Sequence, residues 1–296
     1  MNEGRTVFAQ LMDQLPKYEL DKCIARYGGN RRMRSFSTYE QFLTMAFAQL
    51  TYRESLRDIA TCLHAVGPKL YHSGLRHPVA RSTLADANEK RDWRIFADFA
   101  QVLIQQALTL YSDEPFGVEL EKDAYALDST TIDLCLSLFP WAKFRRHKAA
   151  IKLHTLLNLR GNFPTVIIVS TGKVHDVNIL DQLSFEAGSF YVFDRAYLDF
   201  GRLHRLHTQR AFFVTRAKKN MKCRRRYSRP VDKTTGLRCD QTIILSGFYS
   251  RRDYPEVLRR ISFRDPETKK LYVFLTNNFS EPALKIAQLY RCRWNI

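Results

Sequence analysis

The hydrophobic residues of this chain change their spacing near residue 118. Before that point they recur every three to four residues, which is typical of helices with one buried face. Ser37 and Glu40, for example, form a capping-box pattern, and apolar residues follow them at helical spacing from Phe42 to Leu50. This spacing predicts an all-helical N-terminal domain over residues 1–112.

After residue 118, apolar and polar residues alternate along several short segments, as they do in strands. The predicted strands span residues 125–134, 151–159, 163–172, 189–198 and 211–216, and predicted helices span 176–183 and 200–208. Three strands, then helix, strand, helix and strand, make a mixed order and not the regular alternation of a parallel α/β sheet. It is the order of the ribonuclease-H-like fold, so we predict an α/β domain with a mixed sheet over residues 118–296.

Residues 217–278 interrupt this order. They open with the run 218–229, which contains seven basic residues and no acid, and further strand-like segments follow. A helical pattern resumes at Ser280, with Pro282 in the first turn, where proline is tolerated. We therefore predict a β-rich basic insertion within the second domain.

The net charge of the chain restricts the classes of partner that we expect it to bind. It carries 47 Lys and Arg residues against 30 Asp and Glu residues, a formal net charge of +17, which favours polyanions and nucleic acid first. We find no signal peptide and no apolar run of the roughly 18 residues that span a bilayer, so we expect a cytoplasmic protein without a membrane partner. The six cysteines form no CxxC pair, which argues against a structural zinc site.

Two aspartates stand where metal-dependent phosphoryl transfer would need them. Asp128 lies within the first predicted strand of the second domain, and Asp194 ends the fourth. These strands are neighbours in a ribonuclease-H-like sheet, so the two carboxylates converge at one edge. Carboxylates that converge from separate elements can hold the two metal ions of such a site. An aspartate in a strand can also simply lie on the solvated face of the sheet, without a functional role.

Residues 77–93 present basic and hydroxyl side chains on a short predicted helix. Such a segment suits a helix-turn-helix DNA reader. An ordinary helical bundle with a solvated basic face explains it equally well, and both interpretations stay open here.

Several motifs together resemble a known family. ALDSTTIDL, KFRRHKAAIKLHTLLNLRG, VFDRAYLDF and the terminal Tyr290-x-x-Arg293 are similar to the DDE transposases of bacterial insertion sequences, and RSTLADANEKRDWRIF resembles their N-terminal helical domain. More narrowly, the chain resembles insertion-sequence family four, which carries a Tyr-x-x-Arg-x-x-x-Glu-x6-Lys signature. The resemblance covers essentially the whole chain.

The resemblance implies a function and a set of site residues. Asp128 and Asp194 would be the first two catalytic carboxylates and would hold Mg²⁺, or Mn²⁺, in a two-metal site. Tyr290 and Arg293 would contact DNA phosphate near the cut. The protein would bind double-stranded DNA at element ends and at the target, as a homodimer on paired ends, and would cleave and transfer strands. The basic residues expected to bind phosphates are Lys218, Lys219, Lys222, Arg224, Arg225 and Arg226, unless their run is a solvated disordered loop.

The family signature places its third carboxylate at position 297, one residue past Ile296. We therefore interpret the chain as a C-terminally truncated transposase, and we expect it to bind DNA weakly without transposing. One alternative is a ribonuclease-H-like nuclease in which Glu281 or Glu256 replaces the third acid. The other is a non-catalytic DNA-binding remnant.

Overall fold

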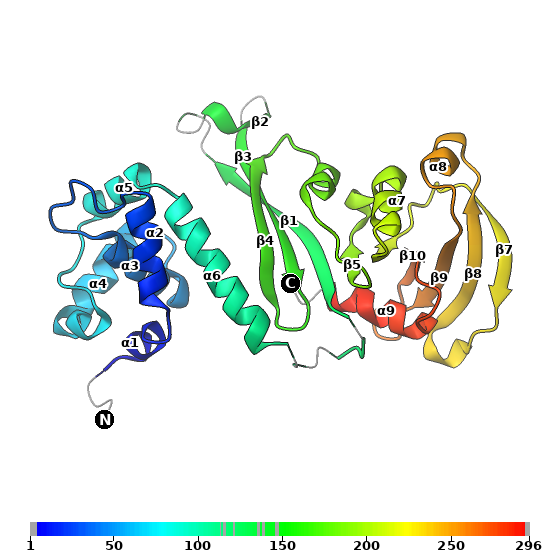
Figure 1. Cartoon of the computed structure of the whole chain (residues 1–296), viewed down its shortest axis with the longest axis horizontal. Helices are drawn as coiled ribbons and strands as arrows, with labels where there is room; N and C mark the ends of the chain where they lie inside the picture. The colour runs from blue at the N-terminus through cyan, green and yellow to red at the C-terminus, as the bar shows by residue number, and fades with distance from the viewer. Residues whose placement is uncertain are drawn as a thin grey trace. The chain divides into compact units, whose positions relative to one another are not determined.

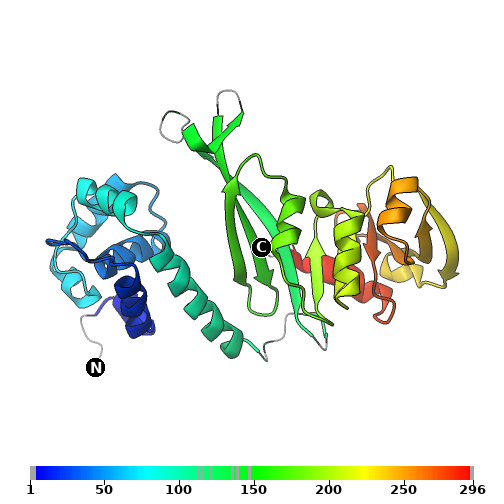
Figure 2. The ribbon, with the colours of Figure 1, turned by 45° about the horizontal axis from the view of Figure 1, so that its top comes forward.

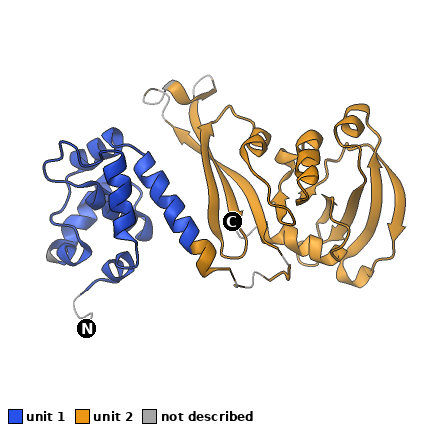
Figure 3. Cartoon of the chain, viewed as in Figure 1, with its two compact units in different colours: residues 1–106 blue, residues 107–296 orange. Residues whose placement is uncertain are grey.

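The computed structural model describes residues 5–112, 114, 117–120, 122–134, 137, 140–145 and 148–293. The chain divides into two compact units, Met1–Gln106 and Ala107–Ile296 (Figure 3). The boundary falls within the long helix α6, Arg94–Leu110. Each unit has its own buried apolar clusters, and each is described by itself.

Unit 1 is built from helices. They are α1 (Val7–Met12), α2 (Lys17–Arg26), α3 (Thr38–Leu50), α4 (Leu56–Val66), the 3-10 helix η1 (Gly67–Ser73), α5 (Arg81–Lys90) and most of α6. The capping box expected from Ser37 and Glu40 is present at the start of α3. Arg76 donates to both carboxylate oxygens of the buried Glu40 at 2.9 Å, which ties the chain after η1 to α3.

Helix α5 occupies the segment considered as a helix-turn-helix reader. Its basic residues Arg81 and Lys90 are exposed. Arg91, which follows it, is half-buried and donates to Gln41 and to the backbone carbonyls of Phe36 and Ser37. Arg91 is therefore engaged in contacts within unit 1. A partner could reach the exposed residues of α5 instead.

Unit 2 is a mixed sheet with helices on both faces (Figure 1). Among the described residues the sheet has ten strands in the order β2-β3-β1-β5-β6-β10-β9-β8-β7, with β4 paired to β3. Their bounds are β1 (Ala124–Leu134), β2 (Lys143–Arg145), β3 (Lys148–Asn158), β4 (Phe163–Thr171), β5 (Phe190–Phe193), β6 (Phe212–Arg216), β7 (Cys223–Arg229), β8 (Leu237–Leu245), β9 (Leu258–Arg264) and β10 (Leu271–Thr276). The pairs β1–β5 and β5–β6 are parallel, whereas the neighbours on either side are antiparallel. The mixed α/β fold class is confirmed.

Alternation along the central strands sends side chains to opposite faces of the sheet. On β1, Tyr125 and Leu127 join one buried cluster, whereas Ala124 and Ala126 join the other. Helix α7 (Phe200–Thr208) covers the first face and α9 (Ala283–Cys292) covers the second (Figures 1 and 2). The remaining helices are η2 (Pro140–Ala142), η3 (Asp176–Gln182), η4 (Arg195–Tyr197), η5 (Lys233–Thr235) and α8 (Phe248–Asp253).

The segment 217–278 contains β7 to β10, and these strands extend the central sheet. β10 pairs with β6 in antiparallel register, and β9, β8 and β7 follow in order. Arg259 and Asp240 form a buried two-bond ion pair between β9 and β8, at 2.9 and 2.8 Å. In the part of the chain that the structure describes, no helix has the length and apolar character to cross a membrane.

Candidate active site

Asp128 lies on β1 where the strand leaves the core. The four residues Ala124 to Leu127 are buried, and from Asp128 onward the strand becomes progressively exposed. The Asp128 side chain is 42% exposed, and its Oδ1 accepts a hydrogen bond from the backbone N–H of Ser129 at 2.9 Å. The strand therefore carries a partly exposed carboxylate on backbone that is paired with β3.

Asp194 follows β5 directly. The four residues of that strand are all buried, and Asp194 is the first residue after them. Its carboxylate accepts from the backbone N–H of Ala196 and so caps η4, while its own carbonyl accepts from Thr215 on β6 at 3.2 Å. These contacts fix the turn that carries the second acid.

The parallel register brings the two acids to the same edge. Leu127 of β1 lies opposite Phe193 of β5, so Asp128 and Asp194 are the residues that follow this pair. Ligands of open α/β sheets bind at the carboxyl ends of parallel strands. Asp194 stands directly after β5, and Asp128 stands at the point where β1 loses its parallel partner. The adjacency of their strands, expected from the strand order, is present.

Tyr197 lies beneath this edge. It is 1% exposed, and it interacts electrostatically with Asp128, Asp194 and Asp176. Burial raises the pKa of Tyr197, so the phenol stays neutral beside the acids.

Arg293, just past the last residue of α9, faces Asp128. Its side chain is 7% exposed, and its Nη1 donates to Asp128 Oδ2 at 3.2 Å. Tyr290 lies one turn earlier on the same face, is 1% exposed, and packs its ring 4.8 Å from that of Phe274. The helical spacing thus points both residues inward, as expected, but toward the sheet and the first acid. Their contact with DNA phosphate stays a prediction.

The basic run lies on ordered backbone. Arg224, Arg225 and Arg226 are on β7, an edge strand paired with β8, and Lys218, Lys219 and Lys222 lie on the chain leading to it. All six side chains are exposed. Lys218, Lys219 and Arg225 line a cavity, whereas Lys222, Arg224 and Arg226 do not.

A second polar cluster, which the sequence did not reveal, lies on β3 beside Asp128. Lys152 Nζ donates to Asp176 Oδ1 at 2.9 Å, and the buried His154 is 4.0 Å from the same oxygen. Burial lowers the pKa of His154. His175 occupies the N-cap position of η3, and Asp176 pairs with Lys152. In the sequence, the alternating pattern of β3 predicts only a strand. It does not show that His154 is buried or that Lys152 meets Asp176.

The donors present suit a hard divalent cation. Mg²⁺ in proteins is commonly held by one or two carboxylates together with substrate phosphates, and Asp128 and Asp194 supply two. Within the described residues, no group of three or more His, Cys, Asp or Glu side chains is spaced to hold a metal ion. Residues 294–296 lie outside the described residues.

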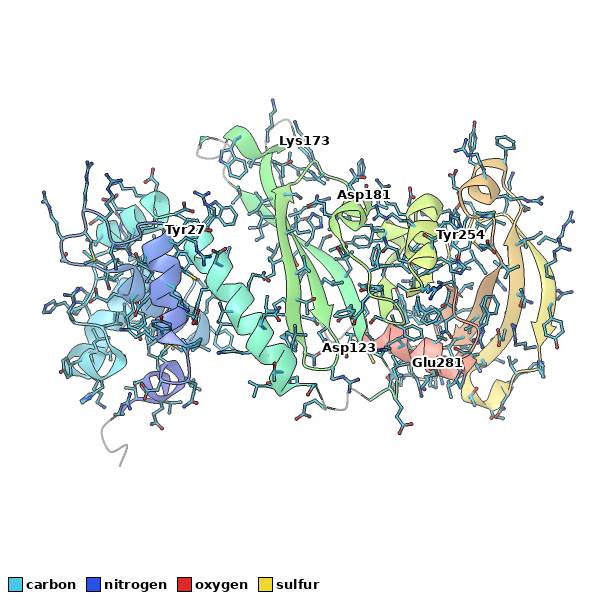
Figure 4. The ribbon with its side chains drawn as sticks, in the orientation of Figure 1. Tyr27, Asp123, Lys173, Asp181, Tyr254 and Glu281 are labelled. Carbon is cyan, nitrogen blue, oxygen red and sulfur yellow. The ribbon has the colours of Figure 1, made fainter. Side chains whose placement is uncertain are left out.

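Neither glutamate considered as a substitute acid joins this pair. Glu281, labelled in Figure 4, lies just before α9 and pairs with Lys285, whereas Arg293 contacts Asp128 at the opposite end of that helix. Glu256 interacts electrostatically with His207 of α7 and with Tyr254, which directly follows α8. Their positions count against the nuclease alternative that required one of them.

Comparison with known proteins identifies the family. Residues 119–296 match the model of the transposase DDE domain. The chain belongs to this family. Residues 3–76 match a domain of unknown function, DUF4372.

Curated relatives agree with the transposase DDE family. A Sinorhizobium fredii protein described as a transposase is 30% identical over 217 residues, which are 72% of this chain and 59% of that protein. A Geobacillus stearothermophilus protein, described as a transposase for an insertion sequence element, is 30% identical over 182 residues, 61% of this chain and 47% of that protein. The chain thus spans 47% to 59% of the length of these relatives. Membership in insertion-sequence family four and truncation stay predictions.

Proposed function

We propose that this chain carries the paired aspartates of a metal-dependent DNA transposase, which cleaves DNA at the ends of an insertion sequence and transfers the strands. The observation that carries the proposal is the parallel register of β1 and β5, whose last pair, Leu127 and Phe193, is followed on one strand by Asp128 and on the other by Asp194. Family membership supports the reaction class.

In this proposal Asp128 and Asp194 hold Mg²⁺ or Mn²⁺. When bound, the metal supplies Lewis-acid stabilisation of charge on the phosphoryl group and activation of the attacking oxygen. The chain's own residues do the positioning. β1 and η4 fix the two carboxylates, and Arg293 orients Asp128 through its Oδ2. Tyr197, kept neutral by burial, adds no charge beneath them.

Double-stranded DNA is the proposed partner. The net charge of +17 and the basic run 218–229 favour a polyanion, and we expect Lys218, Lys219, Lys222, Arg224, Arg225 and Arg226 to contribute contacts to phosphates. A homodimer on paired element ends and a cytoplasmic location complete the proposal, and both rest on the resemblance to insertion-sequence transposases.

The decisive experiment combines metal binding with strand cleavage. Asp128→Asn and Asp194→Asn are compared with Asp133→Asn, a matched control on β1 whose side chain is 71% exposed. Mn²⁺ binding is measured by electron paramagnetic resonance with duplex DNA present, and nicking is measured with Mg²⁺. We expect Asp128→Asn and Asp194→Asn to lose Mn²⁺ binding and Asp133→Asn to retain it. Equal Mn²⁺ binding by the unchanged chain and by all three variants would overturn the proposal.

A non-catalytic DNA-binding chain is the second candidate. The pairing of Asp128 with Arg293 favours it, because a carboxylate already paired with a cation has less affinity for a metal. Absence of both Mn²⁺ binding and nicking in the unchanged chain, together with DNA binding that Asp128→Asn leaves unchanged, would support this candidate over the catalytic one.

A further inference from the structure

A cavity of about 510 Å³ lies next to the candidate active site in unit 2. It is lined by six cationic side chains that come from four separate segments. These are Arg195 from η4, Arg216, Lys218 and Lys219 from the end of β6 and the residues after it, Arg225 from β7 and Arg260 from β9. Arg195 is the residue directly after Asp194, so the cavity begins at the second acid.

These six cations have no acidic partner among the described residues. No described carboxylate lies within ion-pair distance of any of them, and no described acidic side chain lines the cavity. Other arginines of unit 2 are paired with acids, for example Arg202 with Asp181 and Arg259 with Asp240. Six like charges around one cavity repel one another, and that cost is relieved when an anion enters.

Neutral groups hold three of the six cations in place. Arg260 Nη1 donates to the side-chain carbonyl of Gln241 at 3.0 Å. The Arg216 guanidinium lies 5.0 Å from the centre of the Tyr272 ring, and Lys218 Nζ donates to the backbone carbonyl of Leu198 at 3.4 Å. A neutral partner restricts the side chain without cancelling its charge, so these cations are arranged for an anion that the chain itself does not supply.

We propose that this cavity binds the phosphates of one DNA strand and holds that strand against the edge that carries Asp194. The inference rests on the proposed DNA-processing function and adds to it a phosphate site with three residues, Arg195, Arg216 and Arg260, that the sequence did not indicate. A cavity of this volume has the size of a small-ligand pocket, so it accommodates part of a single strand and not the width of a duplex.

The test measures binding of a single-stranded oligonucleotide of roughly four nucleotides, the smallest site that such grooves use. Calorimetric titrations are made on the full chain in a metal chelator, so their outcome does not depend on cleavage. Arg216→Gln with Arg260→Gln is expected to weaken binding about tenfold or more, because two charge-assisted contacts are lost. Lys218→Gln with Lys219→Gln, which alters exposed residues and leaves the fold intact, is expected to weaken it as well.

The matched control is Arg238→Gln with Arg251→Gln. It removes the same charge from exposed positions of β8 and α8 that do not line the cavity, so screening limits its expected effect to about twofold. Equal losses in the control and in both cavity variants would overturn the proposal. Inorganic pyrophosphate is titrated in parallel, and pyrophosphate binding as tight as that of the oligonucleotide would show a simple anion site and overturn the assignment to a DNA strand.

Discussion

At the scale of single residues, the contact between Arg293 and Asp128 bears directly on the proposed metal site. Arg293 is almost fully buried, so its charge is weakly screened by water, and it lies 3.2 Å from one carboxylate oxygen. In the proposed site, a bound metal would therefore compete with this guanidinium for Asp128.

Replacing Arg293 tests that competition. Without DNA, Arg293→Gln is expected to raise the affinity of the chain for Mn²⁺ roughly tenfold, because a nearby cation is removed. Arg291→Gln, on the same helix, serves as the control, since Arg291 is exposed and pairs with Glu267. Paramagnetic titration of both variants gives the result, and an unchanged affinity in Arg293→Gln would contradict the competition.

Glu40 provides a second residue-scale prediction, which concerns pH. Burial alone would raise the pKa of Glu40, but hydrogen bonds from Arg76 and Ser37 outweigh it and lower the pKa to about 2, from 4.5. A lowered pKa stabilises the folded state above pH 4.5, and that contribution is lost as the pH falls toward 2. Glu40→Gln is expected to cost up to about 3 kcal/mol at neutral pH. Thermal melts of both proteins should converge in this acidic range, and a constant difference would count against it.

At the scale of elements, the buried pair of Arg259 and Asp240 fastens three elements together. Besides its two bonds to Asp240 on β8, Arg259 donates to the carbonyl of Glu281, just before α9, at 2.6 Å. The pair therefore connects the outer strands of the sheet to the helix that brings Arg293 to Asp128.

Breaking this pair should be costly. Arg259→Met leaves the Asp240 carboxylate buried without its main partner, and we expect a loss of about 3–5 kcal/mol in the free energy of unfolding. Adding Asp240→Leu should recover part of that loss, because the uncompensated charge is gone. Urea unfolding of both variants is the measurement, and a double variant no more stable than Arg259→Met would contradict this account.

The elements also show what the sequence can predict. Strand alternation and the strand order predicted the mixed sheet and the adjacency of the strands that carry Asp128 and Asp194, because parallel neighbours end at one edge. The catalytic role of these acids stays a prediction. The inward position of Tyr290 and Arg293 followed from helical spacing, whereas their near-complete burial did not.

Convergence across the sheet could not be predicted. Arg195, Arg216 and Arg260 are separated by 21 and 44 positions (216 − 195 and 260 − 216), and no local pattern joins them. Only the placement of β9 and β10 beside β6 brings them around one cavity. The Lys152–Asp176 pair has the same origin, since it depends on a side chain crossing from β3 to η3.

At the scale of the whole molecule, the two units each carry their own buried clusters. We expect two unfolding transitions in calorimetry, one for each unit. Glu40→Gln should lower only the transition of unit 1, and Arg259→Met only that of unit 2. A single transition that both substitutions shift would contradict independent unfolding.

The sheet is stepped at the two aspartates. β5 stops opposite Leu127, while β1 continues beyond Asp128 to Leu134, paired with β3 throughout. The continuing strands form a wall on one side of the acids, and β6 and β10, followed by the basic cavity, lie on the other. A long substrate thus meets a barrier in one direction and an open, positively charged path in the other. For the proposed DNA substrate, this asymmetry favours one direction of the DNA strand across the site, independently of base sequence.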